Sequence, residues 1–338
     1  MNRSNGLKAR AISCILAAAA VLAVPLPAAK ADDIGSLEAA FDNTFGTEPR
    51  SPRSYDSPFA ARIASLANAE LGRIGVAALD LTSGRSIDVL GNQPFPMAST
   101  SKIAIVATFL EGVDQGRYRL TDRYPLMVPV PSRKFDGPVA PVRAGERLSA
   151  LSLIDLALTR SDNQATDALL AAVGGPAAVN SWVKRAGISD FSINRDIATL
   201  VRDDGAIDPA TTVERRDSAT PLAMVQLLTG LYHGKWLSDE SRAVLLDAMH
   251  RCITGKRRIP ALLPGEARIA HKTGSLHNTS SDIGIIETPD GHVIAVAIYV
   301  TGQGSRWNRE KRIASIARAI YDGYAVDRPY GYPQTAVR

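Results

Sequence analysis

Ser99-Thr-Ser-Lys102 is the first of three short strings that decide the fold, and Ser161-Asp-Asn163 and Lys272-Thr-Gly274 follow it in order. The first string places a serine and a lysine one helical turn apart, on one face of a predicted helix. By chance, S-x-x-K occurs roughly once in a chain of this length, whereas the other two are each expected on the order of 0.05 to 0.1 times. The ordered set therefore indicates a serine nucleophile that works without histidine.

The N-terminal segment of the 338-residue chain predicts an exported protein. Residues 1–31 combine basic side chains, an apolar run over 11–26 and small residues around Ala29-Lys-Ala31, a pattern typical of a signal peptide. We therefore expect a periplasmic or secreted protein. We expect residues 32–57 to be a flexible linker and residues 326–338 a tail. No apolar run is long enough for a membrane span.

Charge and residue usage exclude several function classes. The net charge of +5 arises from 39 basic and 34 acidic residues, and the predicted signal holds four of the bases. Its removal leaves 35 basic residues against 34 acidic ones, so composition indicates no nucleic-acid partner. Cys252 is then the one remaining cysteine, which excludes an intramolecular disulfide. The five histidines show no metal-ligand spacing, so we expect neither a metal nor a cofactor.

The order of predicted elements is typical of an α+β fold. Two early strands and three late ones predict a five-stranded antiparallel sheet flanked by the terminal helices. We expect one α/β lobe from residues 58–96 and 215–325, an all-helical lobe over 97–214, and the active site in the cleft between them. Prolines between 126 and 145 predict an irregular excursion, and residues 188–214 a long surface loop.

From about residue 58 to 325 the chain resembles the class A serine β-lactamases, within the penicillin-recognising serine hydrolases. The resemblance rests on the three strings and on five flanking stretches. These stretches are Phe95-Pro-Met-Ala-Ser-Thr-Ser-Lys102, Arg216-Asp-Ser-Ala-Thr-Pro221, Thr254-Gly-Lys-Arg-Arg-Ile-Pro-Ala-Leu-Leu-Pro264, Ala270-His-Lys-Thr-Gly-Ser275 and Asp282-Ile-Gly-Ile-Ile286. The flanks favour the β-lactamase branch over the carboxypeptidase branches.

The acylation chemistry falls on Ser99, Lys102 and Ser161. A serine hydroxyl is a poor nucleophile near neutral pH and needs a base within hydrogen-bond reach. Lys102 can be that base only if burial or a neighbouring cation such as Lys272 lowers its pKa. The resemblance implies that Ser161 relays a proton to the leaving nitrogen of an opened lactam.

The resemblance also implies the substrate-binding residues. Asn163 is expected to bind the substrate side-chain amide and to help hold Lys102, and Lys272 and Thr273 are expected to bind the substrate carboxylate. The oxyanion is expected between the backbone N–H groups of Ser99 and Ser275.

One departure from the family pattern concerns deacylation. The family uses a loop glutamate about 35 residues beyond S-D-N to activate water, but no glutamate lies between Glu146 and Glu214 here. Alignment on Asn194-Arg195 puts Ile197 at that position and Val201 where an asparagine usually holds the water. An aliphatic side chain cannot accept a proton.

Three explanations of this departure remain open. Asp196 can take over as the deacylation base, although a loop ion pair is the more ordinary role for it. Asp203 or Asp204 can do so through a rearranged loop. Alternatively, deacylation is slow.

A second departure concerns the substrate carboxylate. No arginine or lysine lies between Lys272 and Arg306, a stretch where some relatives supply an arginine. Carboxylate binding then depends on Lys272 and Thr273 alone, or on an arginine from elsewhere.

These observations predict a monomeric serine β-lactamase that opens the β-lactam ring through an acyl-serine intermediate. The first alternative is a D,D-peptidase-like or other serine acyl hydrolase that acts on peptidoglycan-peptide-like substrates and deacylates β-lactams slowly. The second is a noncatalytic penicilloyl-binding sensor or scaffold.

Overall fold

The computed structural model describes residues 57–130 and 137–326. The expected signal peptide, almost all of the expected linker and almost all of the expected tail lie outside these ranges. Within them, no helix combines the length and the apolar character needed to cross a membrane.

A five-stranded antiparallel sheet in the order β2-β1-β10-β9-β8 confirms the predicted α+β fold. β9 and β10 are almost wholly buried, and β8 forms one edge. The Lys272-Thr-Gly274 string therefore lies on an edge strand, where one side stays available for a ligand. The strands are β1 (Ile74–Asp80), β2 (Ser86–Val89), β8 (Arg268–Leu276), β9 (Thr279–Glu287) and β10 (Val293–Thr301).

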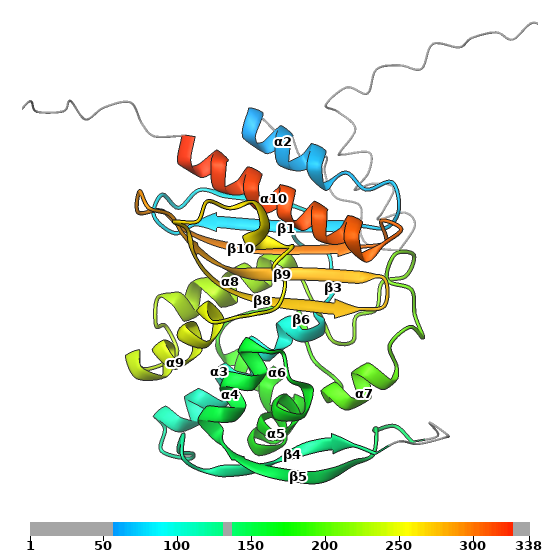
Figure 1. The fold of residues 1–338 in the computed structure, drawn as a ribbon, viewed down its shortest axis with the longest axis vertical. Helices are drawn as coiled ribbons and strands as arrows, with labels where there is room; N and C mark the ends of the chain where they lie inside the picture. The colour runs from blue at the N-terminus through cyan, green and yellow to red at the C-terminus, as the bar shows by residue number, and fades with distance from the viewer. Residues whose placement is uncertain (1–56, 131–136, 327–338) are drawn as a thin grey trace, which may run out of the picture.

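Helices cover both faces of this sheet (Figure 1). The terminal helices α2 (Pro58–Ala67) and α10 (Arg306–Val326) pack together on one face, as predicted. α8 (Pro221–Tyr232) covers the opposite face, and α9 (Asp239–His250) follows it. The burial explains why β10 is a nearly continuous run of β-branched residues and alanine.

The second lobe is built around α3 (Lys102–Asp114), which is buried along most of its length. Three further helices surround it: α4 (Ala150–Thr159), α5 (Asn163–Val173) and α6 (Pro176–Arg185). In Figure 1 this lobe lies next to the edge strand β8 and near α8 and α9.

This lobe is not entirely helical, because a two-stranded antiparallel sheet forms where an irregular excursion was predicted. β4 (Arg123–Pro129) pairs with β5 (Val142–Ser149), and the register shifts between Pro125 and Met127. Both strands of a two-stranded sheet are edges, so prolines that lack an N–H can be accommodated. The proline content was therefore wrongly taken as a signal against strands.

The expected loop over 188–214 also contains regular structure. β6 (Phe191–Ser192) joins β7 (Ser218–Ala219) and β3 (Phe95–Pro96) in a small three-stranded sheet, and α7 (Ile197–Arg202) follows. α7 has six residues, too few to show a helical period in the sequence. The prediction of a long loop without structure was wrong for these segments.

Candidate active site

Ser99 lies in a short 3-10 helix, η1 (Ala98–Ser101), that leads directly into α3. The preceding Ala98 has φ of +49°, a strained conformation for a residue with a side chain. Two hydroxyls hold the turn: Thr100 Oγ1 donates to the Met97 carbonyl and Ser101 Oγ to the Ala98 carbonyl, both at 2.8 Å. The turn leaves Ser99 half-buried at the start of α3.

Lys102 is fully buried one turn after Ser99. Its Nζ lies 2.7 Å from the Ser161 carbonyl oxygen, 2.7 Å from Asn163 Oδ1 and 3.2 Å from the Asp162 carbonyl oxygen. Burial, and then the positive charge of Lys272, lowers the pKa of Lys102 well below its usual value. A buried amine with a lowered pKa can accept a proton near neutral pH.

The S-D-N string forms the turn that enters α5. Ser161 has φ of +60°, and Asp162 caps the helix by accepting from Ala165 N at 2.7 Å. This turn directs the carbonyls of Ser161 and Asp162 at Lys102, while Ser161 Oγ accepts from Lys272 Nζ at 2.9 Å. The structure thereby brings the three strings into direct contact.

Lys272 supplies a buried positive charge at the edge of the sheet. Its Nζ donates to Ser161 Oγ and to the Thr273 carbonyl, both at 2.9 Å. Burial lowers the pKa of Lys272 to about 8, so the ammonium form dominates at pH 7. Thr273 Oγ1 lies 2.7 Å from Thr254 Oγ1, and Ser275 is exposed two residues further along β8. This part of β8 can bind an anion.

Arg258 is a site residue that the sequence reading did not identify. Its guanidinium donates to Ser275 Oγ at 2.6 Å and to the Gly274 and Ser281 carbonyls at 2.8 Å. Glu310 on α10 lies 3.3 Å from the same group. Arg258 lies outside the strand after K-T-G but is buried against it. Its one sequence signal was its place in the Thr254–Pro264 stretch.

A buried histidine on β8 and a buried aspartate on β9 lie beside Lys272. His271 Nδ1 is 2.9 Å from Asp282 Oδ1. Burial alone would lower the pKa of His271, but Asp282 raises it to about 10. Burial likewise would raise the pKa of the nearby Cys252 thiol, but a hydrogen bond and the charge of His271 lower it. His271 and Asp282 therefore form a buried ion pair close to Lys272.

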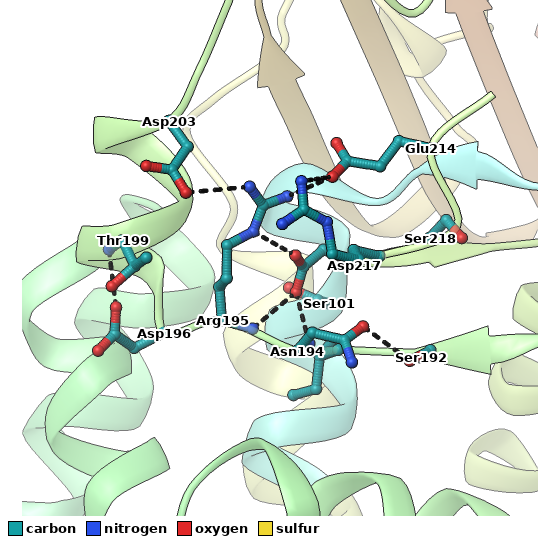
Figure 2. Close-up of polar contacts among 12 residues, drawn as sticks. Ser101, Ser192, Asn194, Arg195, Asp196, Thr199, Asp203, Glu214, Asp217 and Ser218 are labelled. Carbon is teal, nitrogen blue, oxygen red and sulfur yellow. Dashed lines mark hydrogen bonds and ion pairs between the residues drawn. The ribbon is translucent and has the colours of Figure 1, made fainter. Parts of the chain in front are cut away.

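Arg195 holds in place the loop segment that was expected to carry a deacylation base (Figure 2). Arg195 Nε lies 2.7 Å from Asp217 Oδ2, and its other nitrogens pair with Asp203 and Glu214. Asp217 Oδ1 also accepts from the backbone N–H of Asn194 at 2.7 Å and of Arg195 at 3.1 Å. The two ends of the segment are therefore joined by a largely buried ion-pair network.

The three loop carboxylates proposed from the sequence all have structural partners. Asp196 caps α7 by accepting from Thr199 N at 2.7 Å (Figure 2). Asp203 pairs with Arg195 and Arg202, and Asp204 accepts from His277 N at 2.7 Å. No hydrogen bond connects any of the three to Lys102 or Ser161 in the described part of the chain.

A fourth carboxylate, which the sequence reading did not single out, lies on α5. Asp167 is one turn after Asn163 and accepts from Ile197 N at 2.7 Å and Ala198 N at 2.9 Å. Burial raises the pKa of Asp167 to about 6. Its one sequence signal was the i,i+4 spacing from Asn163, which places both side chains on one helix face.

Across residues 57–130 and 137–326, no group of three or more histidine, cysteine, aspartate or glutamate side chains could hold a metal ion.

Known proteins resemble this chain in both sequence and structure. A sequence profile described as the β-lactamase enzyme family matches residues 58–324. β-Lactamase CTX-M-25 of Escherichia coli is 30% identical over 267 residues, which are 78% of this chain and 88% of that protein. The extended-spectrum β-lactamase PER-1 of Pseudomonas aeruginosa is 27% identical over 289 residues, 82% and 90% of the two chains. An ancestral class A β-lactamase structure superposes with a TM-score of 0.68 at 33% identity, covering 78% of this chain and 99% of that one. The chain belongs to the β-lactamase enzyme family.

Proposed function

We propose that this protein hydrolyses β-lactams through an acyl-Ser99 intermediate. The observation that carries the proposal is that Lys102, one helical turn from Ser99, and Lys272 both contact Ser161. The cluster provides a base, a proton relay and a cation, which are the groups that acylation of a serine by a cyclic amide requires. Family membership and the names of the relatives support the same activity.

In the proposed acylation, the Lys102 amine takes the Ser99 proton as Oγ attacks the lactam carbonyl carbon. The backbone N–H groups of Ser99 and Ser275 bind the oxyanion, and each such donor contributes about 3 kcal/mol to the transition state. The C–N bond then breaks, Ser161 donates its hydroxyl proton to the leaving nitrogen, and the proton that Lys102 took from Ser99 passes to Ser161 Oγ, which leaves both groups as they began. The Lys272 ammonium, 2.9 Å from Ser161 Oγ, favours this transfer electrostatically.

We propose that the carboxylate of the substrate binds at Lys272, Thr273 and Ser275. Arg258 lies directly behind Ser275 and adds a buried positive charge to this end of β8. Asn163, whose Oδ1 contacts Lys102, has an amide group that can also bind the side-chain amide of the substrate.

A slowly deacylating acyl hydrolase is the second candidate function. Ile197 supports it, because this residue occupies the position of the family's loop glutamate and cannot activate water. The complete acylation cluster disfavours the third reading, a noncatalytic sensor. We also infer export of the protein, on the basis of the basic, apolar and small-residue pattern of residues 1–31.

Covalent labelling tests the proposal. Ser99→Ala should abolish labelling by a fluorescent penicillin, whereas Ser181→Ala, at the exposed serine of the S-x-x-K string in α6, should retain it. Persistent labelling of Ser99→Ala would exclude the acyl-Ser99 mechanism. The lifetime of the adduct, followed by mass spectrometry, separates the two candidate functions: rapid return to free protein supports a β-lactamase, and a long-lived adduct supports the acyl hydrolase.

A further inference from the structure

We infer that the carboxylate of Asp167 replaces the missing loop glutamate and accepts a proton from the water that hydrolyses the acyl-Ser99 ester. The inference rests on the proposed function. It assigns the second half of that reaction to a residue of α5 instead of a residue of the loop.

The position of the Asp167 carboxylate is the first support. Its Oδ1 lies 2.7 Å from the backbone nitrogen of Ile197, the residue at the glutamate position, and its Oδ2 lies 2.9 Å from that of Ala198. A carboxylate is therefore present at this point of the loop, although a different element supplies it. The two N–H donors fix its orientation and leave a second lone pair on each oxygen.

The second support is the connection between Asp167 and the acylation cluster. Residues four apart on a helix face one another, with Cβ atoms about 5–6 Å apart. Asp167 is thus the neighbour of Asn163, and Asn163 Oδ1 contacts Lys102 Nζ at 2.7 Å. When Lys102 carries a proton, its charge lowers the pKa of Asp167, which agrees with their proximity.

Space for water is the third support. A cavity of about 180 Å³ is lined by Asn163, Gln164 and Asp167 of α5, by residues of α7, and by apolar residues of β4 and of the segment before β5. It is large enough for several waters, and the amide and carboxylate groups supply hydrogen-bond partners. Asn163 lines this cavity and also contacts Lys102 through its Oδ1 atom.

The protonation state suits a general base. Burial raises the pKa of Asp167 to about 6; the Ile197 and Ala198 N–H groups oppose this shift, Asp196 adds to it, and Lys102 opposes it. The carboxylate is therefore ionised at pH 7 but more basic than an exposed aspartate. A general base with a pKa near the working pH is the most effective.

In the proposed step, Asp167 removes one proton from water while the water oxygen forms a bond to the ester carbonyl carbon. The tetrahedral intermediate then breaks its bond to Ser99 Oγ, and the proton passes to that oxygen. The products are free Ser99, ionised Asp167 and the opened-ring acid.

Asp167→Asn tests the inference, with Asp196→Asn as the matched control because asparagine also caps helices. We expect Asp167→Asn to form the penicillin adduct at the normal rate and to lose it at least 100-fold more slowly. Asp196→Asn should change the lifetime less than threefold. If the full-length protein forms no adduct at all, the proposed function fails. If it forms one and the Asp167→Asn adduct decays at the normal rate, only the present inference fails.

The pH profile of the unmodified protein provides a test that needs no variant. Deacylation should slow below a midpoint near pH 6, as Asp167 becomes protonated. Asp196 and Lys102 are the charged groups whose effects on Asp167 must be included, and Arg202 lines the same cavity. Ile197→Glu, introduced into Asp167→Asn, should restore turnover by returning a carboxylate to the loop. A flat profile between pH 5 and 8, or undetectable deacylation, would overturn the inference.

Discussion

Raising the pH from 7 to 9 should remove the positive charge of Lys272 and weaken the use of carboxylate-bearing lactams. Burial lowers the pKa of this lysine to about 8. Roughly nine-tenths of the molecules therefore carry the ammonium at pH 7 and roughly one-tenth at pH 9. A hydrogen bond to a charged group contributes about 1.5–3 kcal/mol, so the neutral form should bind the carboxylate at least about tenfold more weakly. We expect kcat/KM to fall about fivefold to tenfold across this range.

The assay compares two substrates over pH 6.5–9.5. A penicillin should show the alkaline fall with a midpoint near pH 8, because kcat/KM reports groups of the free enzyme. An activated phenyl ester without a carboxylate should show little fall, since its leaving group needs neither Lys272 nor a proton. Cys252→Ser is the control for the nearby thiol, whose lowered pKa could add a second titration. His271, with a pKa of about 10, stays charged over most of this range.

Stability should change in the opposite direction, which separates a titration of Lys272 from alkaline unfolding. The unfolded chain binds a proton on this lysine up to about pH 10.5, whereas the folded chain releases it near pH 8. The unfolded state therefore holds more protons between these values, and stability rises with pH by up to about 3 kcal/mol from this group. Urea unfolding of the unmodified protein and of Lys272→Met isolates that contribution. A flat kcat/KM for the penicillin, or equal falls for both substrates, would refute the reasoning.

Two substitutions test the groups that support the site. Arg258→Ala should lower the free energy of unfolding in urea by about 3 kcal/mol and raise KM for carboxylate substrates, because it removes a buried donor paired with Glu310. Arg257 is an exposed partner of the same Glu310, so Arg257→Ala should lower the free energy of unfolding by less than about 1 kcal/mol. Asp217→Ala should cost about 3–5 kcal/mol, because it leaves Arg195 largely buried without its main partner. Its adduct should also persist longer while acylation stays close to normal, as measured by mass spectrometry; equal effects on both steps would contradict this separation.

The α/β lobe was predictable because its signals are local. Alternating and continuous apolar runs, with turn residues at Ser83-Gly84 and Pro289-Asp-Gly291, are typical of antiparallel strands. The pairing of β1 with β10 joins segments far apart in the chain, but the sheet offers few other places for two short buried strands. In the second lobe, β4 and β5 were missed because proline content outweighed the weak strand signal of exposed, polar segments.

Sequence patterns named candidate site residues only where those residues share an element or a string. Ser99 and Lys102 lie one helical turn apart, so a pattern of four letters identifies the pair. Arg258 and Asp167 act across elements: Arg258 reaches β8 from outside the strand, and Asp167 reaches the backbone of α7. The donors to Asp167 are backbone N–H groups, which every residue except proline carries. The side chains of α7 therefore give no sequence signal for this contact.

The two halves of the proposed reaction are supported by different kinds of structure. Acylation depends on groups held by α3, the α5 turn and β8, where Lys102 and Lys272 are fully buried and hydrogen-bonded across elements. The surroundings of Ile197 depend instead on a segment whose ends are joined through Arg195 and Asp217. A change in that segment can therefore alter how long the acyl-enzyme lasts while leaving its formation intact. The absence of a loop glutamate is therefore compatible with a complete acylation site, and the proposed role of Asp167 requires that this segment keep the Ile197 and Ala198 N–H groups in place.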